Sequence, residues 1–199
     1  TVPPARGREA AEAFVADLVA RGDYAAVAAE PALAGYRALH ARLGKTGRQY
    51  LPSPESLFKV LFKRREWRAI DPLVDAYTLV ALRTRVSIGA HDLARLCLPV
   101  RLVPTQGGEP FLPIGESTLQ TLGTNEYVYR DATGQVLGRM EIRQAAATCV
   151  TDTTRDVLFI VQGHAGLRLP TLRATVDELL ATVRALVGPI DEVDVSAIA

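Results

Sequence analysis

The chain has 199 residues, with 23 Lys and Arg against 22 Asp and Glu and a formal net charge of +1 at pH 7. Its hydrophobic content of 48% excludes a disordered chain, and no run of about 18 uncharged apolar residues predicts a membrane span. A chain with a pI of about 7.8 has no broad nucleic-acid-coating surface, so a polyanion would have to bind a local basic patch.

The two cysteines, Cys97 and Cys149, are far apart and form no C-x-x-C pair, which argues against a zinc ribbon or a redox motif. We interpret them as reduced thiols of a cytoplasmic protein. The first four residues lack the layout of a secretory signal, and the missing initiator methionine indicates a processed or trimmed start.

Two amphipathic helices are predicted in the first part of the chain. Apolar residues recur at three- and four-residue spacing over 8–21 and again over 32–43, and Gly44 is a natural helix stop. His40 lies on the apolar side of the second helix, which indicates a partly buried helix residue.

A third helix is predicted to begin at 53–55, where a capping serine, a proline and an acidic residue follow one another. It carries five basic residues within ten positions: Lys59, Lys63, Arg64, Arg65 and Arg68. Two interpretations remain open. The run is either a solvated helix end whose cations favour the helix dipole, or a patch that contacts RNA phosphates.

The rest of the chain is predicted to contain another helix, several strands and a closing helix. Asp71 caps a fourth helix that runs to about residue 83, and the last helix covers 170–187. Short alternating or β-branched runs predict strands over 98–103, 126–130, 136–142 and 157–162, with a hairpin turn at 131–134. This order predicts one α+β domain over residues 1–199.

The inventory of catalytic motifs is thin. The sequence has no G-x-S-x-G elbow, no H-E-x-x-H and no glycine-rich phosphate loop. Its three histidines are too far apart to suggest a metal site, so no metal and no cofactor is predicted. A catalytic triad assembled from distant segments remains open.

One polar constellation stands at Gly89-Ala90-His91-Asp92. A glycine precedes a titratable pair that could orient or activate water. The alternative is that Asp92 is only a helix N-cap.

A second constellation is Arg139-Met140-Glu141-Ile142-Arg143-Gln144. Strand alternation would place Arg139, Glu141 and Arg143 on one face, with Gln144 at the edge. This face is either an exposed charge ladder or the floor of a pocket for a carboxylate, phosphate or ammonium group.

Six segments carry a family resemblance that covers residues 51–163: LPSPESL at 51–57, IDPLVDAYTLV at 70–80, SIGAHDL at 87–93, EYVYRD at 126–131, RMEIRQ at 139–144 and TTRDVLF at 153–159. Together they resemble the B3/B4 domain of the phenylalanyl-tRNA synthetase β subunit. They are more similar still to free-standing bacterial proteins made of that domain alone.

The resemblance implies a three-layer β/β/α sandwich and a site that hydrolyses tRNA carrying the wrong amino acid, here in trans. The partner would be the aminoacylated acceptor end of tRNA. Because the ester is activated, a positioned water, backbone dipoles and the ribose hydroxyl could suffice without a protein nucleophile. The expected catalytic residues are His91 and Asp92. The expected substrate-binding residues are Asp75, Tyr77, Gly89, Arg139, Glu141, Arg143 and Gln144.

The sequence departs from the synthetase pattern at three positions. Gly89 stands where that pattern has a histidine, His91 replaces an aromatic residue, and Ile160 falls near a glutamate. The resemblance therefore does not predict that the synthetase's rejected amino acid is the substrate. It suggests that His91 has taken over water activation.

Two other functions remain open. The chain could be a non-catalytic RNA- or tRNA-binding module, or a binder of a free amino acid, because fold similarity does not transfer function. The basic run favours an RNA partner over a free amino acid, and release of amino acid from mischarged tRNA would separate an enzyme from a binding module. The sequence does not indicate the oligomeric state.

Overall fold

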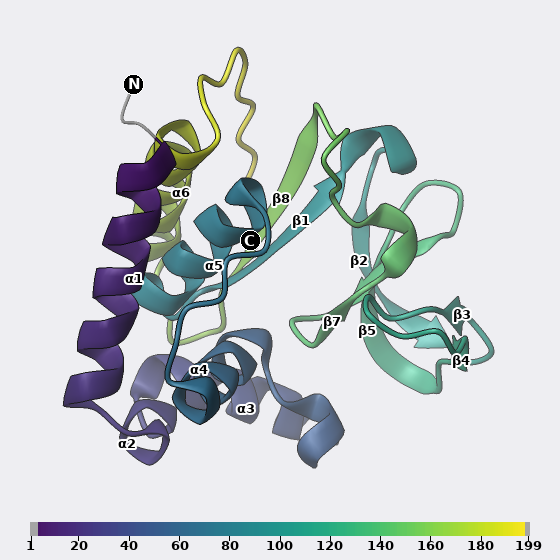
Figure 1. Ribbon diagram of the computed structural model, residues 1–199. Helices are drawn as coiled ribbons and strands as arrows, with labels where there is room; N and C mark the ends of the chain where they lie inside the picture. Colours follow the sequence, from purple (N-terminus) through teal and green to yellow (C-terminus); the bar gives the residue numbers. More distant parts are fainter. Residues whose placement is uncertain (1–3, 198–199) are drawn as a thin grey trace.

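The structure is a computed structural model that describes residues 4–197, with helices before and after a block of antiparallel strands (Figure 1). The helices are α1 (Pro4–Arg21), α2 (Tyr24–Ala28), α3 (Pro31–Arg42), α4 (Ser53–Arg64), α5 (Pro72–Thr84) and α6 (Leu169–Leu186). The short 3₁₀ turns are η1 (Arg48–Tyr50), η2 (Leu93–Arg95) and η3 (Ala146–Thr148).

The strands form three antiparallel sheets, β1-β8, β2-β5-β6-β7 and β3-β4. Their bounds are β1 (Ser87–Asp92), β2 (Arg101–Gln106), β3 (Pro110–Phe111), β4 (Gln120–Thr121), β5 (Thr124–Arg130), β6 (Val136–Arg139), β7 (Arg143–Gln144) and β8 (Val157–Gln162). The predicted α+β class is confirmed.

The β1-β8 ribbon separates helices α1, α5 and α6 from the four-stranded sheet. Figure 1 shows α1, α5 and α6 on one side of the ribbon and β2, β5 and β7 on the other. Helix α5 packs on β1 and helix α6 on β8. The order helix, ribbon, sheet agrees with the β/β/α layering that the resemblance implied.

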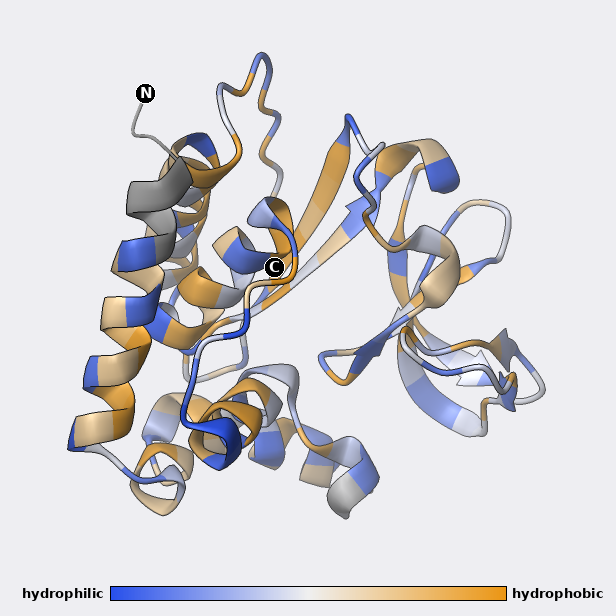
Figure 2. Ribbon diagram, viewed as in Figure 1, coloured by the Kyte–Doolittle hydropathy of each residue, from blue (hydrophilic) through white to orange (hydrophobic). Residues whose placement is uncertain are grey.

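Separate apolar clusters hold these layers together. One joins α5 and α6 to the ribbon through buried residues that include Val80, Ile88 and Leu179. Strand β8 is apolar almost throughout, as Figure 2 shows. Burial of such side chains stabilises the fold by roughly 25 cal/mol per Å².

The helix boundaries follow the predicted signals in most places. The carboxylate of Asp71 accepts hydrogen bonds from the backbone N–H groups of Leu73 and Val74, at 2.9 and 3.3 Å, and so caps α5. Helix α3 ends at Arg42, and Gly44 adopts a φ of 69°, which a glycine tolerates without strain.

Helix α4 begins differently from the prediction. Its N-cap is Pro52, and Ser53 is the first helical residue, whose backbone N–H donates to a loop carbonyl. Glu55 is buried and does more than favour the dipole. It accepts a hydrogen bond from the Tyr24 hydroxyl at 2.8 Å and pairs with Arg37.

Two strand predictions were wrong. Strand β1 was not among the predicted strands, because its glycine and polar residues hide the alternation of a strand that is largely buried on both faces. The predicted strand 136–142 ends at Arg139. Glu141 lies in a turn with a φ of 52°, and the chain reverses into β7. The three charges at 139, 141 and 143 therefore do not alternate along one strand.

Within residues 4–197, no helix is both long and apolar enough to cross a bilayer.

Candidate functional site

The face of the β1-β8 ribbon that points away from the helices forms the candidate site. Cross-strand pairing puts Gly89 opposite Ile160 and His91 opposite Leu158. Since side chains alternate along a strand, these residues share one face, and the neighbouring positions pack against α5 and α6. The predicted Gly89 and His91 therefore face the four-stranded sheet.

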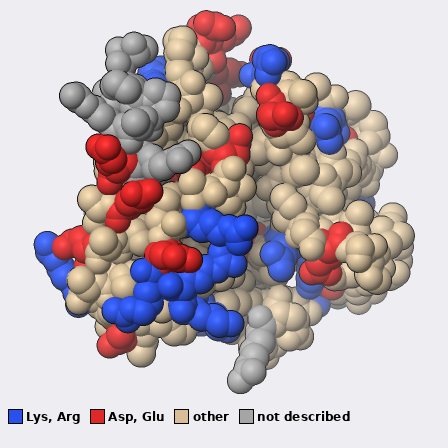
Figure 3. All heavy atoms as spheres, viewed as in Figure 1, with Lys and Arg blue, Asp and Glu red and all other residues tan. Residues whose placement is uncertain are grey.

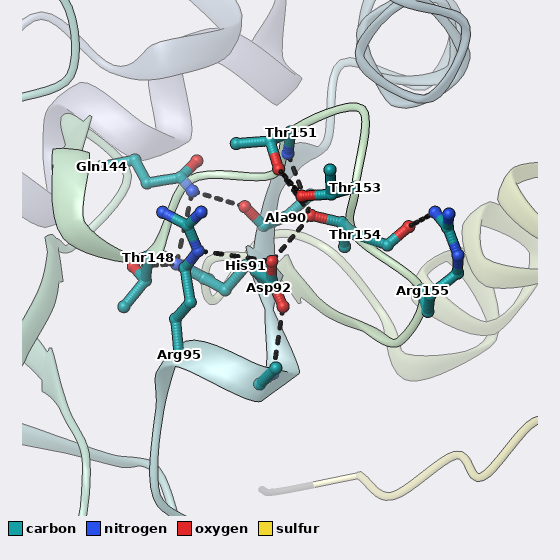
Figure 4. A network of polar contacts seen from close by, with 11 residues as sticks. Ala90, His91, Asp92, Arg95, Gln144, Thr148, Thr151, Thr153, Thr154 and Arg155 are labelled. Carbon is teal, nitrogen blue, oxygen red and sulfur yellow. Dashed lines mark hydrogen bonds and ion pairs between the residues drawn. The ribbon is translucent and has the colours of Figure 1, made fainter.

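His91 is buried and held by two side chains from the other layer (Figure 4). Its Nδ1 lies 2.9 Å from the Thr148 hydroxyl and 3.3 Å from the amide nitrogen of Gln144. That nitrogen also donates to the backbone carbonyl of Ala90. Burial lowers the pKa of His91 from 6.5 to about 4, so the imidazole is neutral at pH 7.

Gly89 leaves a space beside this histidine. A Cβ atom placed at Gly89 would have one neighbour within 4 Å, the Nε2 of His91 at 3.9 Å. The other nitrogen of the ring thus borders a space that no side chain fills. Ile160 is the cross-strand partner of Gly89.

Both carboxylate oxygens of Asp92 make hydrogen bonds within the protein. One carboxylate oxygen accepts from the backbone N–H of Ala94 at 3.0 Å and caps η2, as the alternative interpretation expected. The other accepts from the Thr154 hydroxyl at 2.8 Å and lies 3.4 Å from Nε of Arg95. Its catalytic role stays a prediction, and these contacts favour a positioning role.

Arg139 and Arg143 are cross-strand partners on β6 and β7. They alternate with Gly138 and Gln144, which form the neighbouring pair, so the two arginines lie on the opposite face of the hairpin from Gln144. Nη2 of Arg139 is 2.5 Å from the Glu126 carboxylate. A pocket-floor role for the arginines stays a prediction that this geometry does not favour.

Arg143 is only loosely paired. Its Nη2 lies 3.9 Å from the carboxylate of Glu116, and its side chain is 52% exposed. A contact of this kind at the surface contributes at most about 1 kcal/mol.

Glu141 is buried at the far end of the ribbon from His91. Oε1 accepts from Nε2 of Gln162 at 2.8 Å, and Oε2 lies 3.7 Å from Nε2 of His40. Burial raises the pKa of the Glu141 carboxyl, while His40 lowers it. Because the carboxylate is enclosed, the predicted contact with a substrate would require the hairpin to open.

Asp75 and Tyr77 belong to the helical side of the ribbon. The Tyr77 ring packs edge-on against Phe159, with ring centroids 6.4 Å apart, and burial raises its pKa to about 12. Asp75 accepts a hydrogen bond from the backbone N–H of Ile70 at 3.0 Å. The structure therefore brings together Gly89, His91 and Gln144 but not Asp75 and Tyr77.

The basic run lies on the surface of α4 and the segment after it. All five side chains are exposed, and within residues 4–197 none forms an ion pair: Lys59, Lys63, Arg64, Arg65 and Arg68. Figure 3 shows Lys and Arg side chains gathered over α4. These charges are available to an anionic partner.

Sequence reasoning missed Thr148 and Gln162. Thr148 is the single polar residue in the stretch Ala145–Val150 other than a cysteine, a signal that could have drawn attention to it. No comparable signal marks Gln162, which ends an apolar strand.

Among the described residues, no group of three His, Cys, Asp or Glu side chains is placed to hold a metal ion. Cys97 and Cys149 are both free thiols.

The layered fold and the face that carries His91 define an α+β domain with a candidate site between its two β layers. The chain matches the family model of the B3/4 domain over residues 35–172, so it belongs to the B3/4 domain family. The match extends the resemblance seen over 51–163 into helices α3 and α6.

Among solved structures, the chain is similar to an N-terminal fragment of the phenylalanyl-tRNA synthetase β-subunit from Pyrococcus horikoshii. Sequence identity is 20% and the TM-score is 0.49. The similarity covers 59% of this chain and 41% of that one. No curated protein matches this sequence.

Proposed function

We propose that this protein hydrolyses the ester bond of mischarged aminoacyl-tRNA in trans, within the cytoplasm. The observation that carries the proposal is His91, a neutral imidazole with one nitrogen fixed by Thr148 and the other beside the space over Gly89. Membership of the B3/4 domain family supports a tRNA-related role.

Hydrolysis of an aminoacyl ester requires few protein groups. The aminoacyl ester is already activated, and hydrolysis needs a water held near the carbonyl carbon and hydrogen-bond donors near the carbonyl oxygen. Water adds to the carbonyl carbon, the bond to the ribose oxygen breaks, and that oxygen takes a proton. The products are the free amino acid and tRNA with a free terminal hydroxyl.

The basic patch on α4 would supply affinity for the RNA. Five exposed cations without acidic partners can replace counterions on tRNA phosphates, which makes binding salt-dependent. The net charge of +1 adds no broader attraction.

One observation favours the alternative of a non-catalytic tRNA-binding module. The carboxylates of Asp92 and Glu141 are both buried and engaged, so neither is free to act as a general base. A binder of free amino acids is less well supported, because the exposed basic patch would then have no role.

A deacylation screen over a panel of mischarged tRNAs tests the proposal. We expect the protein to release free amino acid from at least one mischarged tRNA faster than buffer alone. The matched correctly charged tRNA and the His91→Leu variant are the controls. If no member of the panel is hydrolysed while tRNA still binds, the chain is a binding module.

A further inference from the structure

The side-chain amide of Gln144 has a defined orientation. A backbone carbonyl can only accept a hydrogen bond, so the Gln144 atom that faces the Ala90 carbonyl must be the amide nitrogen. The same NH₂ group lies 3.3 Å from Nδ1 of His91.

This orientation determines where the proton of His91 resides. If Nδ1 carried the proton, it could donate to the Thr148 hydroxyl, but the NH₂ group of Gln144 would then face another donor and find no acceptor on the ring. With Nδ1 unprotonated, its single lone pair accepts from the Thr148 hydroxyl at 2.9 Å, and the N–H of Gln144 at 3.3 Å shares that lone pair as a longer second contact. Thr148 has no other side-chain hydrogen bond within residues 4–197, so its hydroxyl is free to donate.

The proton of the neutral ring is then on Nε2. That nitrogen makes no hydrogen bond to any described residue, although the residue is only 3% exposed. It borders the space over Gly89, where a Cβ would have no other neighbour within 4 Å. An N–H group from which no described residue accepts, beside such a space, can donate to a ligand that brings an acceptor oxygen.

We infer that His91 is a hydrogen-bond donor through Nε2 to an acceptor oxygen bound over Gly89, and that Gln144 and Thr148 are positioning residues that hold this tautomer. The assignment of the tautomer and of the site rests on the contacts described above and does not depend on the proposed function. The identity of the oxygen, the carbonyl oxygen of an aminoacyl ester, rests on the proposed function.

This role differs from the water activation expected from the sequence. A general base needs a lone pair on Nε2, and this tautomer has a proton there. As a donor, His91 would stabilise the negative charge that develops on the carbonyl oxygen while water adds to the carbonyl carbon. The proton lost by the water goes to solvent, and the departing ribose oxygen recovers one.

The protein contains an internal reference for this assignment. Nδ1 of His164 accepts from the backbone N–H of Gly166 at 3.0 Å, and its Nε2 lies 2.8 Å from the backbone carbonyl of Ala32. These backbone partners leave His164 only the tautomer with its proton on Nε2.

The first experiment is long-range ¹H–¹⁵N correlation NMR of the intact protein with ¹⁵N-labelled histidine at pH 7. His91→Gln and His164→Gln assign the two rings. We expect His91 to show a protonated Nε2 and an unprotonated Nδ1, the same pattern as His164. Gln144→Leu and Thr148→Val should mix the tautomers of His91 and leave His164 unchanged, which also verifies the fold. A proton on Nδ1 in the wild-type protein would overturn the inference.

The second experiment measures single-turnover deacylation of the tRNA found in the screen. His91→Gln keeps an amide donor near the position of Nε2, whereas His91→Leu removes it. We expect the leucine variant to lose on the order of 10²–10³-fold in rate and the glutamine variant to recover a large part of that loss. Equal loss in both variants would exclude a donor role. If the wild-type protein hydrolyses no tRNA, the proposed function fails, while the NMR result still decides the tautomer.

Discussion

The Tyr36 hydroxyl donates a hydrogen bond to the backbone carbonyl of Gln162 at 2.7 Å, across 126 positions of sequence. The same hydroxyl accepts from the backbone N–H of Ser87 at 2.9 Å. One buried side chain of α3 therefore joins the first residue of β1 to the last residue of β8. Burial raises the pKa of Tyr36 far above its ordinary range, so the hydroxyl keeps its proton.

Tyr36→Phe should lower the free energy of unfolding by about 1–3 kcal/mol, because it leaves the buried N–H of Ser87 without a partner. Urea unfolding measures the change. Tyr127→Phe is the matched control, since Tyr127 is 37% exposed, and it should change stability by less than about 0.5 kcal/mol. Equal stabilities of the two variants would contradict a role for the Tyr36 bridge.

Asp131→Asn should destabilise the hairpin between β5 and β6. Burial raises the pKa of Asp131, but hydrogen bonds from Cys97, Thr133 and Gln135 outweigh it and hold the pKa below 3.8. A depressed carboxyl pKa stabilises the fold above the unfolded value, and that contribution is lost as pH falls through the folded value. We expect a loss of about 1–3 kcal/mol at pH 7 that shrinks in acid.

Thermal unfolding between pH 7 and pH 3 measures this dependence. Asp152→Asn, at an exposed position, is the control and should not change the profile. A loss for Asp131→Asn that is the same at every pH would show that the charge of Asp131 plays no part.

His91 should give the protein an acid-sensitive stability. Its pKa is lowered from 6.5 to about 4, so the unfolded state binds a proton more readily than the folded state. Stability is therefore complete above pH 6.5 and falls as pH decreases toward 4, by about 3 kcal/mol in all. Urea unfolding of wild type and His91→Gln across pH 8 to 4 measures it.

The His91→Gln variant should lose most of this slope between pH 6.5 and pH 4. Between pH 8 and pH 7 the two proteins should have parallel profiles, which serves as the internal control. Parallel profiles over the whole range would mean that burial does not penalise the charged form of His91.

Charge reversal on the α4 patch should weaken tRNA binding. Replacing Lys59, Lys63 and Arg64 by Glu removes three cations, so the slope of log K against log salt should become shallower by about 2–3, with at least tenfold lower affinity at low salt. Filter binding across a salt series measures both. The matched control reverses Arg168, Arg173 and Arg184, three exposed arginines on or beside α6, with the same change in net charge.

The patch assignment fails if the two triple variants lose the same affinity. In that case net charge, and not the position of the cations, determines binding.

Arg143→Ala should change neither stability by more than about 0.5 kcal/mol nor the rate of deacylation. The side chain is 52% exposed and lies on the opposite face of the β6-β7 hairpin from Gln144. Melting curves and single-turnover rates of Arg143→Ala and Gln144→Leu make the comparison. A large rate loss in the Arg143 variant alone would restore the pocket-floor interpretation.

The helices could be predicted because their signals are local. The cap at Asp71 and the stop at Gly44 act within one helical turn, and apolar periodicity extends over many residues. Strand β1 has no such signal, because burial on both faces removes the alternation that marks a half-exposed strand.

The candidate site could be predicted only in part, for a related reason. Gly89 and His91 stand out in the sequence, but the partners that fix the histidine lie 53 and 57 positions away. The run at 139–144 alternates like a strand, and a local pattern cannot show that Glu141 adopts a positive φ and reverses the chain. Tertiary contacts determine both the partners of His91 and the chain reversal at Glu141.

Every strand of the four-stranded sheet lies between β1 and β8, whose ends meet where Asp92 pairs with Val157. Residues 93–156 therefore leave the β1-β8 ribbon and return to it at adjacent points. We call this continuous segment the module. Exchanging this module for that of another family member would leave the ribbon's own residues in place while replacing Gln144 and Thr148. The ligand preference of one scaffold could in this way diversify by recombination of a single continuous segment.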